Sequence, residues 1–391
     1  MWPGGHPIYF SEARGARLVD VDGNEYADFC LGDTGAMAGH SPEPVMRAIR
    51  ERSGLTTMLP TEDAAWVGEE LARRFSLPFW QFSLSATDAN RWLLRMCRQV
   101  TRRPKVAVFN WCYHGSVDEA LVGRVGNVGP MVDPAETTRV AEFNELGSVE
   151  AALAHGDVAC LLMEPALTNI GIVLPEEGFL DGVRELCTRH GTLLIVDETH
   201  TLSAGPGGCT AAWGLEPDAV SLGKSIAGGV PIGAYGVSAE LAERIAAEED
   251  ADYEDTGGVG GTLAGNALSL AAARATLGEV LTAEAFERMS GLRERFVAGV
   301  DAALERHSVP WSIVSLGARA EYRFSADPPR TGAESAQADD RELGEYLHLY
   351  LLNRGVLITP FHNMALMCPA TTEAQVDRHT EAFTAAVEAL Y

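Results

Sequence analysis

The chain of 391 residues predicts an α/β protein whose central sheet is mostly parallel. From about residue 80, short apolar runs alternate with helical patterns, as in chains of strand–helix–strand units. The runs are apolar throughout rather than alternating, which is typical of strands buried on both faces. One of them, TLLIVDETHT (192–201), ends abruptly in polar residues beginning at Asp197. A hydrophobic content of 46% is enough for a large core and two domains.

Two elements are predicted before the alternation begins. Residues 16–29 (ARLVDVDGNEYADF) alternate apolar and polar side chains around Asp22-Gly23, which favours a β-hairpin. The stretch SPEPVMRAIRE then predicts a helix, with Ser41 as its N-cap and Pro42 in its first turn. Both elements precede the strand–helix region and are not part of its repeating pattern.

The strand–helix region contains four clear strand patterns and one amphipathic helix between two of them, at residues 181–191. The strand patterns are KVAVFN (105–110), VACLLME (158–164), TLLIVDE (192–198) and AVSLGK (219–224). Residues 325–340 contain prolines, glycine and charged side chains and are expected to form an exposed loop.

Near residue 270 the chain becomes helical, and it ends with short strands and a terminal helix at 376–390. We therefore expect a large domain at 41–275 and a smaller α+β domain at 276–391, to which residues 1–40 contribute.

Charge and cysteine content exclude several classes of protein. Thirty Lys and Arg against fifty-five Asp and Glu give a formal charge of −25, which repels nucleic acid and anionic lipid. No apolar stretch reaches the roughly 18 residues of a membrane helix, and MWPGGHPIYF lacks the features of a signal peptide. Seven cysteines without a C-x-x-C pair make disulfides or a metal cluster improbable. We expect a cytoplasmic protein with no nucleic acid, membrane or metal partner.

Asp197 and Lys224 are the strongest candidates for chemistry, because each lies at the end of a predicted buried strand. In open α/β sheets, ligands bind beyond the carboxyl ends of the strands. A P-loop would need glycine at position 218, where the chain has Asp218, and no G-x-S-x-G, H-E-x-x-H or G-x-G-x-x-G motif is present. A lysine that forms a Schiff base and an acid that keeps a pyridine nitrogen protonated are the pair that pyridoxal 5'-phosphate requires. The alternative is a solvated loop lysine.

A phosphate site is predicted in FSLSATDANRWLLRMCRQV (82–100). Ser85, Ala86 and Thr87 precede a helix there, so backbone N–H groups and the Thr87 hydroxyl would face an anion at the positive end of the helix dipole. Taken alone, the same residues also suit an ordinary capped helix.

In these motifs the chain resembles the class III aminotransferases, which are fold type I enzymes dependent on pyridoxal phosphate, and within them the branch that contains glutamate-1-semialdehyde aminomutase. The resemblance runs from about residue 4 to the C-terminus, in the family's order and spacing. It is carried by ARLVDVDGNEYADF, SATDAN, NWCYHGSVDEA, MEPALTNIG, LLIVDETHTL, PDAVSLGKSIAGGVPIGAYG and GGTLAGNALSLAAA. It implies a large domain with a mostly parallel sheet flanked by helices, and a small α+β domain built from both chain ends.

The resemblance also implies roles for individual residues. Lys224 would form the Schiff base and then move a proton between substrate and cofactor, while Asp197 would pair with the pyridinium nitrogen. Tyr113 and Thr199 would lie on the two ring faces; Thr199 replaces the usual valine. The remaining positions implied to contact the cofactor or shape its site are Ser85, Ala86 (usually glycine), Thr87, His114, Glu164 and Asn169. Thr262 matches a threonine that reaches the phosphate of the neighbouring subunit, which implies a homodimer.

Other positions depart from the family. His200 stands where methionine, glutamine or isoleucine is usual, and it either touches substrate or is structural. The segment TLSAGPGG lacks a common arginine. Arg319 and Arg323 are candidates for binding a substrate carboxylate, although exposed strand arginines are the preferred alternative. His362 and Asn363 are weaker candidates for the mouth of the site.

From this pattern we predict an aminotransferase that moves an amino group from a β- or ω-amino acid or an amine to a keto or aldehyde acceptor in two half-reactions. One alternative is intramolecular transfer of the glutamate-1-semialdehyde 2,1-aminomutase type. Another, from a different class, is a catalytically silent pyridoxal-phosphate fold with a binding or regulatory role.

Overall fold

The structure is a computed structural model that describes residues 7–122, 133–248 and 261–390. Predictions that fall on the start of the chain or on the first glycine of the GGTLAGN motif lie outside these residues.

A seven-stranded sheet forms the centre of the large domain, in the order β4-β10-β9-β8-β7-β5-β6. Its strands are β4 (Phe79–Ser83), β5 (Lys105–Phe109), β6 (Thr138–Ala141), β7 (Val158–Met163), β8 (Leu193–Asp197), β9 (Ala219–Leu222) and β10 (Gly233–Val237). All neighbouring pairs from β9 to β6 are parallel, whereas β10 is antiparallel to both β9 and β4. Every residue of β7, β8 and β9 is buried. The prediction of a mostly parallel sheet with strands buried on both faces is confirmed.

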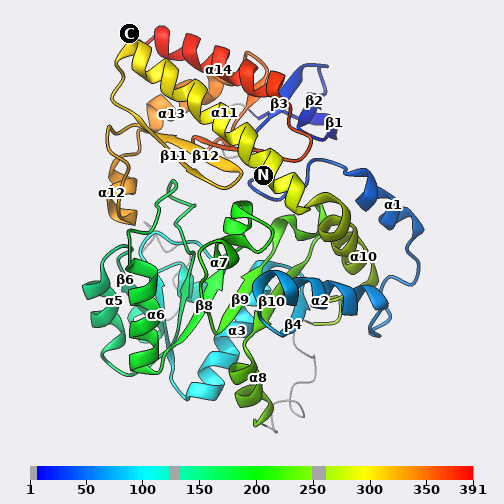
Figure 1. The fold of residues 1–391 in the computed structure, drawn as a ribbon, viewed down its shortest axis with the longest axis vertical. Coiled ribbons are helices and arrows are strands. Elements are labelled where there is room, and N and C mark those ends of the chain that lie inside the picture. The colour runs from blue at the N-terminus through cyan, green and yellow to red at the C-terminus, as the bar shows by residue number, and fades with distance from the viewer. Residues whose placement is uncertain (1–6, 123–132, 249–260, 391) are drawn as a thin grey trace.

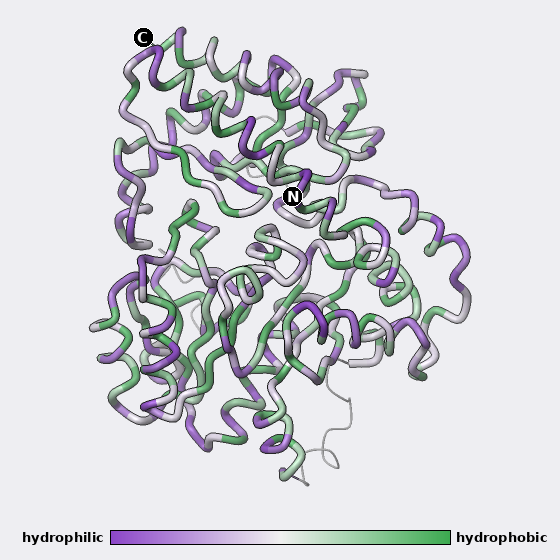
Figure 2. Tube along the Cα trace, in the orientation of Figure 1, coloured by the Kyte–Doolittle hydropathy of each residue, from purple (hydrophilic) through white to green (hydrophobic). Residues whose placement is uncertain are grey.

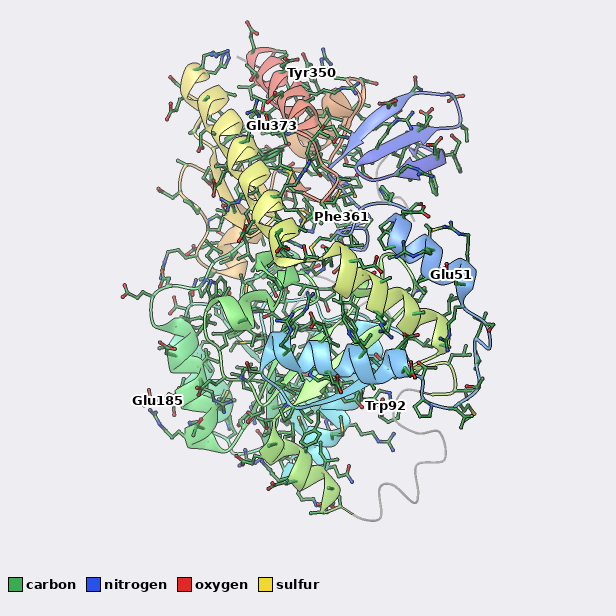
Figure 3. All side chains as sticks on the ribbon, turned by 45° about the vertical axis from the view of Figure 1, so that its right-hand side comes forward. Glu51, Trp92, Glu185, Tyr350, Phe361 and Glu373 are labelled. Atoms are coloured by element: carbon green, nitrogen blue, oxygen red, sulfur yellow. The ribbon has the colours of Figure 1, made fainter. Side chains whose placement is uncertain are left out.

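Helices surround this sheet, and their side chains fill the space between the layers (Figures 1 and 3). The apolar residues are concentrated in the central strands and on the inner helix faces (Figure 2). The helices of this region are α1 (Glu43–Glu51), α2 (Glu62–Phe75), α3 (Ala86–Thr101), α4 (Pro134–Thr137), α5 (Leu146–Leu153), α6 (Phe179–His190), α7 (Gly208–Ala212), α8 (Ala239–Ala246) and α10 (Ala267–Ala275), with the short turns η1 (Asp118–Ala120), η2 (Thr201–Ala204), η3 (Lys224–Ala227) and η4 (Thr276–Val280).

The small domain combines both parts of the chain, as predicted. Its N-terminal strands are β1 (Phe10–Arg14), β2 (Arg17–Asp20) and β3 (Glu25–Asp28), and β3 pairs in parallel with β13 (Val356–Leu357). A second sheet contains β11 (Ser312–Leu316), β12 (Arg319–Arg323) and β14 (Met364–Leu366), and the helices are α11 (Ala283–His307), α12 (Gly332–Gln337), α13 (Arg341–Leu352) and α14 (Glu373–Glu388). Figure 1 shows the blue N-terminal strands beside the red helix α14. The domain boundaries by residue number stay a prediction.

Two local predictions were wrong. The N-cap of α1 is Pro42 rather than Ser41, because Ser41 has a φ of 49° and its hydroxyl donates to the Ala13 carbonyl instead of to the helix. The segment 325–340 is not entirely an exposed loop. It contains α12, and the buried Ser335 donates a hydrogen bond to the Ile170 carbonyl of the large domain.

Candidate active site

Asp197 and Lys224 lie at the same edge of the sheet. Asp197 is the last residue of β8, and Lys224 begins η3, two residues after β9 ends; β8 and β9 are parallel neighbours. Both residues line a cavity of about 510 Å³. The other predicted residues that line it are Ser85, Ala86, Thr87, Tyr113, Thr199 and His200.

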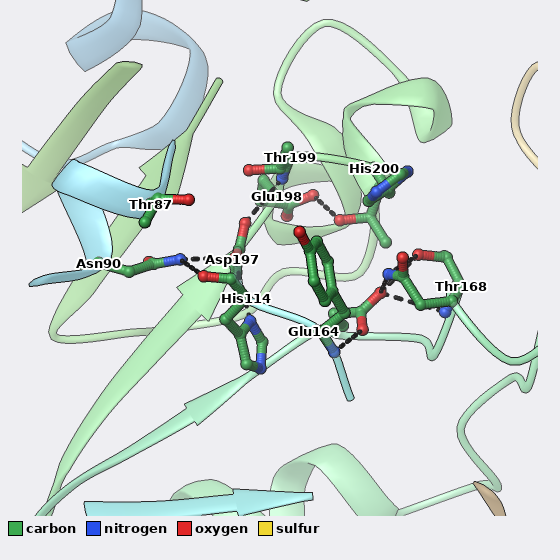
Figure 4. A network of polar contacts seen from close by, with 12 residues as sticks. Thr87, Asn90, His114, Glu164, Thr168, Asp197, Glu198, Thr199 and His200 are labelled. Atoms are coloured by element: carbon green, nitrogen blue, oxygen red, sulfur yellow. Dashed lines mark hydrogen bonds and ion pairs between the residues drawn. The ribbon is translucent and has the colours of Figure 1, made fainter. Parts of the chain in front are cut away.

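The Asp197 carboxylate is buried and held by three donors (Figure 4). Its Oδ2 atom accepts from the Asn90 amide at 2.9 Å and contacts His114 Nδ1 at 3.0 Å, and its Oδ1 atom accepts from the Thr199 N–H at 3.0 Å. Burial raises the pKa of Asp197, but hydrogen bonds and the charge of His114 outweigh it and hold the pKa below 3.8. An ionised carboxylate therefore faces the cavity from its floor.

His114 and Asn90 support Asp197 from behind and do not line the cavity among the described residues. Burial lowers the pKa of His114, but Cys112 and Asp197 raise it, and the net pKa lies well above 6.5. The Asn90 amide also donates to the His114 carbonyl at 3.3 Å. Sequence reasoning gave Asn90 no role. Its position three residues after Thr87 on one helix places both on the same face and was a usable signal.

Lys224 has two close polar partners. Its Nζ atom lies 3.0 Å from Asp33 Oδ2 and 2.6 Å from His200 Nε2. Burial lowers the pKa of Lys224, and Asp33 acts in the opposite direction, with a net pKa below 10.5. Asp33 was missed in the sequence analysis, because it follows the N-terminal hairpin and is separated from Lys224 by most of the large domain. The only local signal was the pair of glycines around it in LGDTG.

The start of α3 provides a site suited to an anion. Ser85 is the N-cap and accepts from the Asp88 N–H at 3.3 Å, while Thr87 Oγ1 accepts from the Ser116 N–H at 3.3 Å. Gly115 has a φ of 78°, and a Cβ atom there would overlap the Thr87 hydroxyl, so this close approach requires glycine. The first N–H groups of a helix have no acceptors within the helix backbone, and Ser85, Ala86 and Thr87 at this helix start line the cavity.

These features fit pyridoxal phosphate. The cavity has an anion site at the start of α3, a carboxylate for the pyridinium nitrogen at Asp197, and an amine at Lys224. In addition, Thr199 Oγ1 is buried and has no hydrogen-bond partner among the described residues, so it is available to a bound group.

Glu164, Asn169 and Thr262 are predicted site residues that do not line this cavity in the described part of the chain. Glu164 Oε1 accepts from the Tyr113 N–H at 3.3 Å, and its Oε2 accepts from the Thr168 N–H at 3.1 Å and from the Asn169 amide at 3.3 Å (Figure 4). Burial raises the pKa of Glu164. Glu164 thus links the backbone of Tyr113 to the turn after β7.

Thr262 is exposed and lines a separate cavity of about 440 Å³. A role for it in the site of the same chain is therefore not supported.

The preferred description of Arg319 and Arg323 as exposed arginines was wrong. Their exposed fractions are 1% and 4%, because β12 is the middle strand of its sheet and faces the large domain. Arg319 donates to Ser203 Oγ at 3.0 Å and to Thr34 Oγ1 at 2.8 Å, whereas Arg323 donates to the Ser335 carbonyl at 2.5 Å. The two guanidinium groups have different partners and do not form one carboxylate clamp.

His362 and Asn363 line another cavity, of about 280 Å³, together with Arg323. Within the described residues neither lines the cavity that contains Lys224, so their predicted place at its mouth is not observed.

The fold and this cavity define a fold type I enzyme dependent on pyridoxal phosphate. Residues 3–387 match the family model described as aminotransferase class-III. The chain belongs to the class-III aminotransferase family, and the predicted family, fold type and cofactor are confirmed.

Similar proteins include both aminomutases and transaminases. The chain is 34% identical to glutamate-1-semialdehyde 2,1-aminomutase 2 of Brevibacillus brevis, over 97% of this chain and 90% of that protein. The chain is 52% identical in sequence to a glutamate-1-semialdehyde-aminomutase from Pseudomonas aeruginosa PAO1 whose crystal structure is known. The superposition covers 100% of this chain and 89% of that chain, with a TM-score of 0.95. A second structure, of a lysine-to-alanine variant of that protein, is in complex with PMP. The crystal structure of an omega-transaminase from Sphaerobacter thermophilus is 28% identical to this chain in sequence. The superposition covers 99% of this chain and 92% of that chain, with a TM-score of 0.88. Among the described residues, no helix has the length and hydropathy needed to span a bilayer.

Proposed function

We propose that this protein catalyses intramolecular amino transfer of the glutamate-1-semialdehyde 2,1-aminomutase type. The observation that carries this proposal is the 52% identity over the whole chain to a structure of that name, with further aminomutases at 30–34% identity. The transaminase relative is more distant, at 28%. The proposal therefore replaces transfer between two substrates, which we preferred from the sequence, with the alternative considered there.

When bound, pyridoxal phosphate supplies an electron-withdrawing ring that stabilises negative charge on the substrate carbon beside the amino group. Asp197, ionised and supported by His114 and Asn90, would hold the ring nitrogen protonated. The N–H groups at the start of α3 and the Thr87 hydroxyl would bind the phosphate. Tyr113 and Thr199 would restrict the ring from its two faces.

Lys224 would hold the reactive end of the cofactor and carry the proton. Burial lowers its pKa, so a larger fraction of the side chain is neutral and able to accept a proton from substrate than at an exposed lysine. In an aminomutase the amino group leaves one carbon and joins the adjacent one, so a single base that reaches both carbons would suffice. In this proposal the Lys224 side chain, which contacts Asp33 and His200, would be that base.

We also propose a homodimer in which Thr262 reaches the phosphate bound by the neighbouring subunit. The support is a group of exposed apolar side chains around Thr262, of a kind that marks protein interfaces. Met58, Leu59 and Leu263 are 76%, 70% and 50% exposed, and Met58 and Leu59 line the same cavity as Thr262. A cytoplasmic location stays a prediction.

The test is turnover of glutamate 1-semialdehyde by the purified protein with pyridoxal phosphate and no added amino acceptor. We expect 5-amino-4-oxopentanoate, the product of moving the amino group from carbon 2 to carbon 1, and faster turnover when 4,5-diaminovalerate is supplied. Lys224→Ala is the control. Turnover that requires a keto acid such as pyruvate would instead support transamination between two substrates. If the wild-type protein captured the cofactor but acted on neither substrate set, the silent-fold alternative would gain support.

A further inference from the structure

Two side chains, those of His200 and Thr34, connect Lys224 to a buried arginine of the small domain, Arg319. Lys224 Nζ lies 2.6 Å from His200 Nε2, and His200 Nδ1 lies 3.0 Å from Thr34 Oγ1. Thr34 Oγ1 in turn accepts from Arg319 at 2.8 Å. Thr34 is fully buried, and His200 and Arg319 are 5% and 1% exposed, so water does not substitute for these contacts.

The direction of each hydrogen bond follows from what each group can donate. Arginine has no acceptor atom, so Arg319 must be the donor to Thr34 Oγ1. The hydroxyl proton of Thr34 then needs an acceptor, and His200 Nδ1 is its remaining partner within the described residues. If Thr34 accepted from both neighbours, its own proton would be buried without a partner, which is costly. Thr34 therefore donates to His200 Nδ1.

The tautomer of His200 follows from this. A neutral imidazole that accepts at Nδ1 carries its proton on Nε2, and that proton points at Lys224 Nζ. An ammonium group has no lone pair to receive it, whereas a neutral amine has one lone pair and two protons. We infer that Arg319, Thr34 and His200 form a directional hydrogen-bond chain that holds the free amine of Lys224 uncharged, with one of its protons donated to Asp33.

The surrounding charges agree with this assignment. Burial is the largest cause lowering the pKa of His200 well below 6.5, and the positive charge of Arg319 acts in the same direction, so the imidazole stays neutral beside an uncharged Lys224. Burial is also the largest cause acting on the pKa of Lys224 and lowers it; Asp33 and Asp197 raise it, Arg319 lowers it, and the net pKa is below 10.5. In the described part of the chain, the charged and titratable groups that act most strongly on Lys224 or His200 include Asp33, Asp197, Arg319, His362 and His114.

The backbone conformation of Asp33 and Thr34 is a second observation that points to a functional site. Asp33 has a φ of 50° and Thr34 a φ of 79°, and a β-branched residue rarely adopts this left-handed region. Such conformations persist where surrounding contacts demand them, and they are concentrated at functional sites. Here the conformation brings Asp33 to Lys224 and Thr34 to His200 within one loop.

A neutral Lys224 is the form that can attack the aldehyde of the cofactor and accept a proton from substrate. The inference rests on the proposed role of Lys224 but is independent of whether amino transfer is intramolecular. It makes His200 and Thr34 positioning residues, which act on the reaction through Lys224.

The experiment measures the amine itself, in the full-length chain freed of cofactor. The rate of acetylation of Lys224 by acetic anhydride is followed by mass spectrometry between pH 6 and 11, because only the neutral amine reacts. Three variants are compared: Thr34→Val removes the hydroxyl with little change of shape, Thr34→Ser keeps it, and Ser225→Ala removes a buried neighbouring hydroxyl that has no partner among the described residues.

We expect the wild-type midpoint to lie below the ordinary lysine value of about 10.4. Thr34→Val should raise it by about one pH unit, so that labelling near neutral pH becomes about tenfold slower. Capture of added pyridoxal phosphate, followed by absorbance, should slow by a similar factor. Thr34→Ser and Ser225→Ala should keep the wild-type profile.

A wild-type midpoint at the ordinary lysine value, or equal midpoints for Thr34→Val and Ser225→Ala, would overturn the inference. If Thr34→Val does not fold, nitrogen NMR of histidine-labelled wild-type protein decides instead. A proton on Nε2 of His200 supports the chain, and a proton on Nδ1 overturns it. Failure of amino transfer with the expected labelling profile would count only against the proposed function.

Discussion

Glu198 offers a demanding test of how the end of β8 is held in place. Its side chain is fully buried and accepts four hydrogen bonds. Oε1 accepts from the N–H and hydroxyl of Thr210 at 2.5 and 2.6 Å, and Oε2 accepts from the Thr201 hydroxyl at 2.5 Å and the Cys209 N–H at 3.0 Å. The carboxylate is used only as an acceptor, on both oxygens.

Glu198→Gln replaces one acceptor oxygen with an NH₂ group of almost the same shape. Whichever way the amide is turned, its NH₂ group faces a backbone N–H, either that of Cys209 or that of Thr210. Two donors then lie buried without an acceptor, and each costs about 1–3 kcal/mol. We therefore expect the free energy of unfolding to fall by about 3 kcal/mol, which is large for a change of one atom.

The assay is urea unfolding of the full-length protein, followed by near-ultraviolet circular dichroism. The matched control is Glu216→Gln, an exposed glutamate before β9, which should change stability by no more than about 0.5 kcal/mol. Cofactor affinity should also fall in Glu198→Gln, because Glu198 adjoins Asp197 and fixes the turn that carries Thr199 and His200. A loss of unfolding free energy below about 1 kcal/mol, or one equal to that of the control, would refute the argument that two buried donors are left without an acceptor.

Three further outcomes are expected. Lys224→Ala should abolish the visible absorbance of lysine-bound cofactor and lower turnover by about 10²- to 10⁴-fold, which absorbance and product assays measure. Thr262→Ala should weaken pyridoxal phosphate binding by at least about tenfold in a titration, because the proposed hydrogen bond to a charged phosphate is lost, while light scattering shows the same assembly as for the wild-type protein. Unchanged affinity would contradict its proposed role. Arg139 donates to the two carboxylate oxygens of Asp157 at 2.8 and 2.7 Å, and this lowers the pKa of Asp157 from 3.8 to about 2. The contribution of Asp157 to the stability of the fold is therefore complete above about pH 4 and is lost as the pH falls through about 2. Asp157→Asn should remove this part of the acid dependence of stability, worth about 1 kcal/mol after solvent screening, in unfolding midpoints measured from pH 2 to 6.

The sequence was sufficient for the central strands, although two other local predictions, the N-cap of α1 and the loop at 325–340, were wrong. Strands β7, β8 and β9 were predicted because their residues are mostly apolar and do not alternate with polar ones, as expected of strands buried on both faces. The placing of Asp197 and Lys224 at one edge then followed from the parallel order of β8 and β9. Their position required no knowledge of contacts made elsewhere in the fold.

Side-chain contacts between distant segments were not predicted. Asp33 and Thr34 reach Lys224 and His200 through a left-handed loop that composition does not reveal. Arg319 was expected at the surface because arginine is rarely buried, yet the strand that carries it is covered by the large domain, and Ser203 and Thr34 satisfy its donors. Partners of this kind become visible only when the two domains are assembled.

The pairing of β3 with β13 sets an order of events during synthesis. Ala27 lies opposite Val356, so the first strands emerge from the ribosome long before their partner exists. The loop that delivers Asp33 and Thr34 follows β3 directly, and Arg319 also belongs to the late part of the chain. The large domain can collapse around its sheet beforehand, but its lysine lacks these neighbours until the late segment has folded back. A nascent chain would therefore assemble the sheet that carries Asp197 and Lys224 first, and the part of the cavity wall formed by Gly32, Gly35 and Ala36 last.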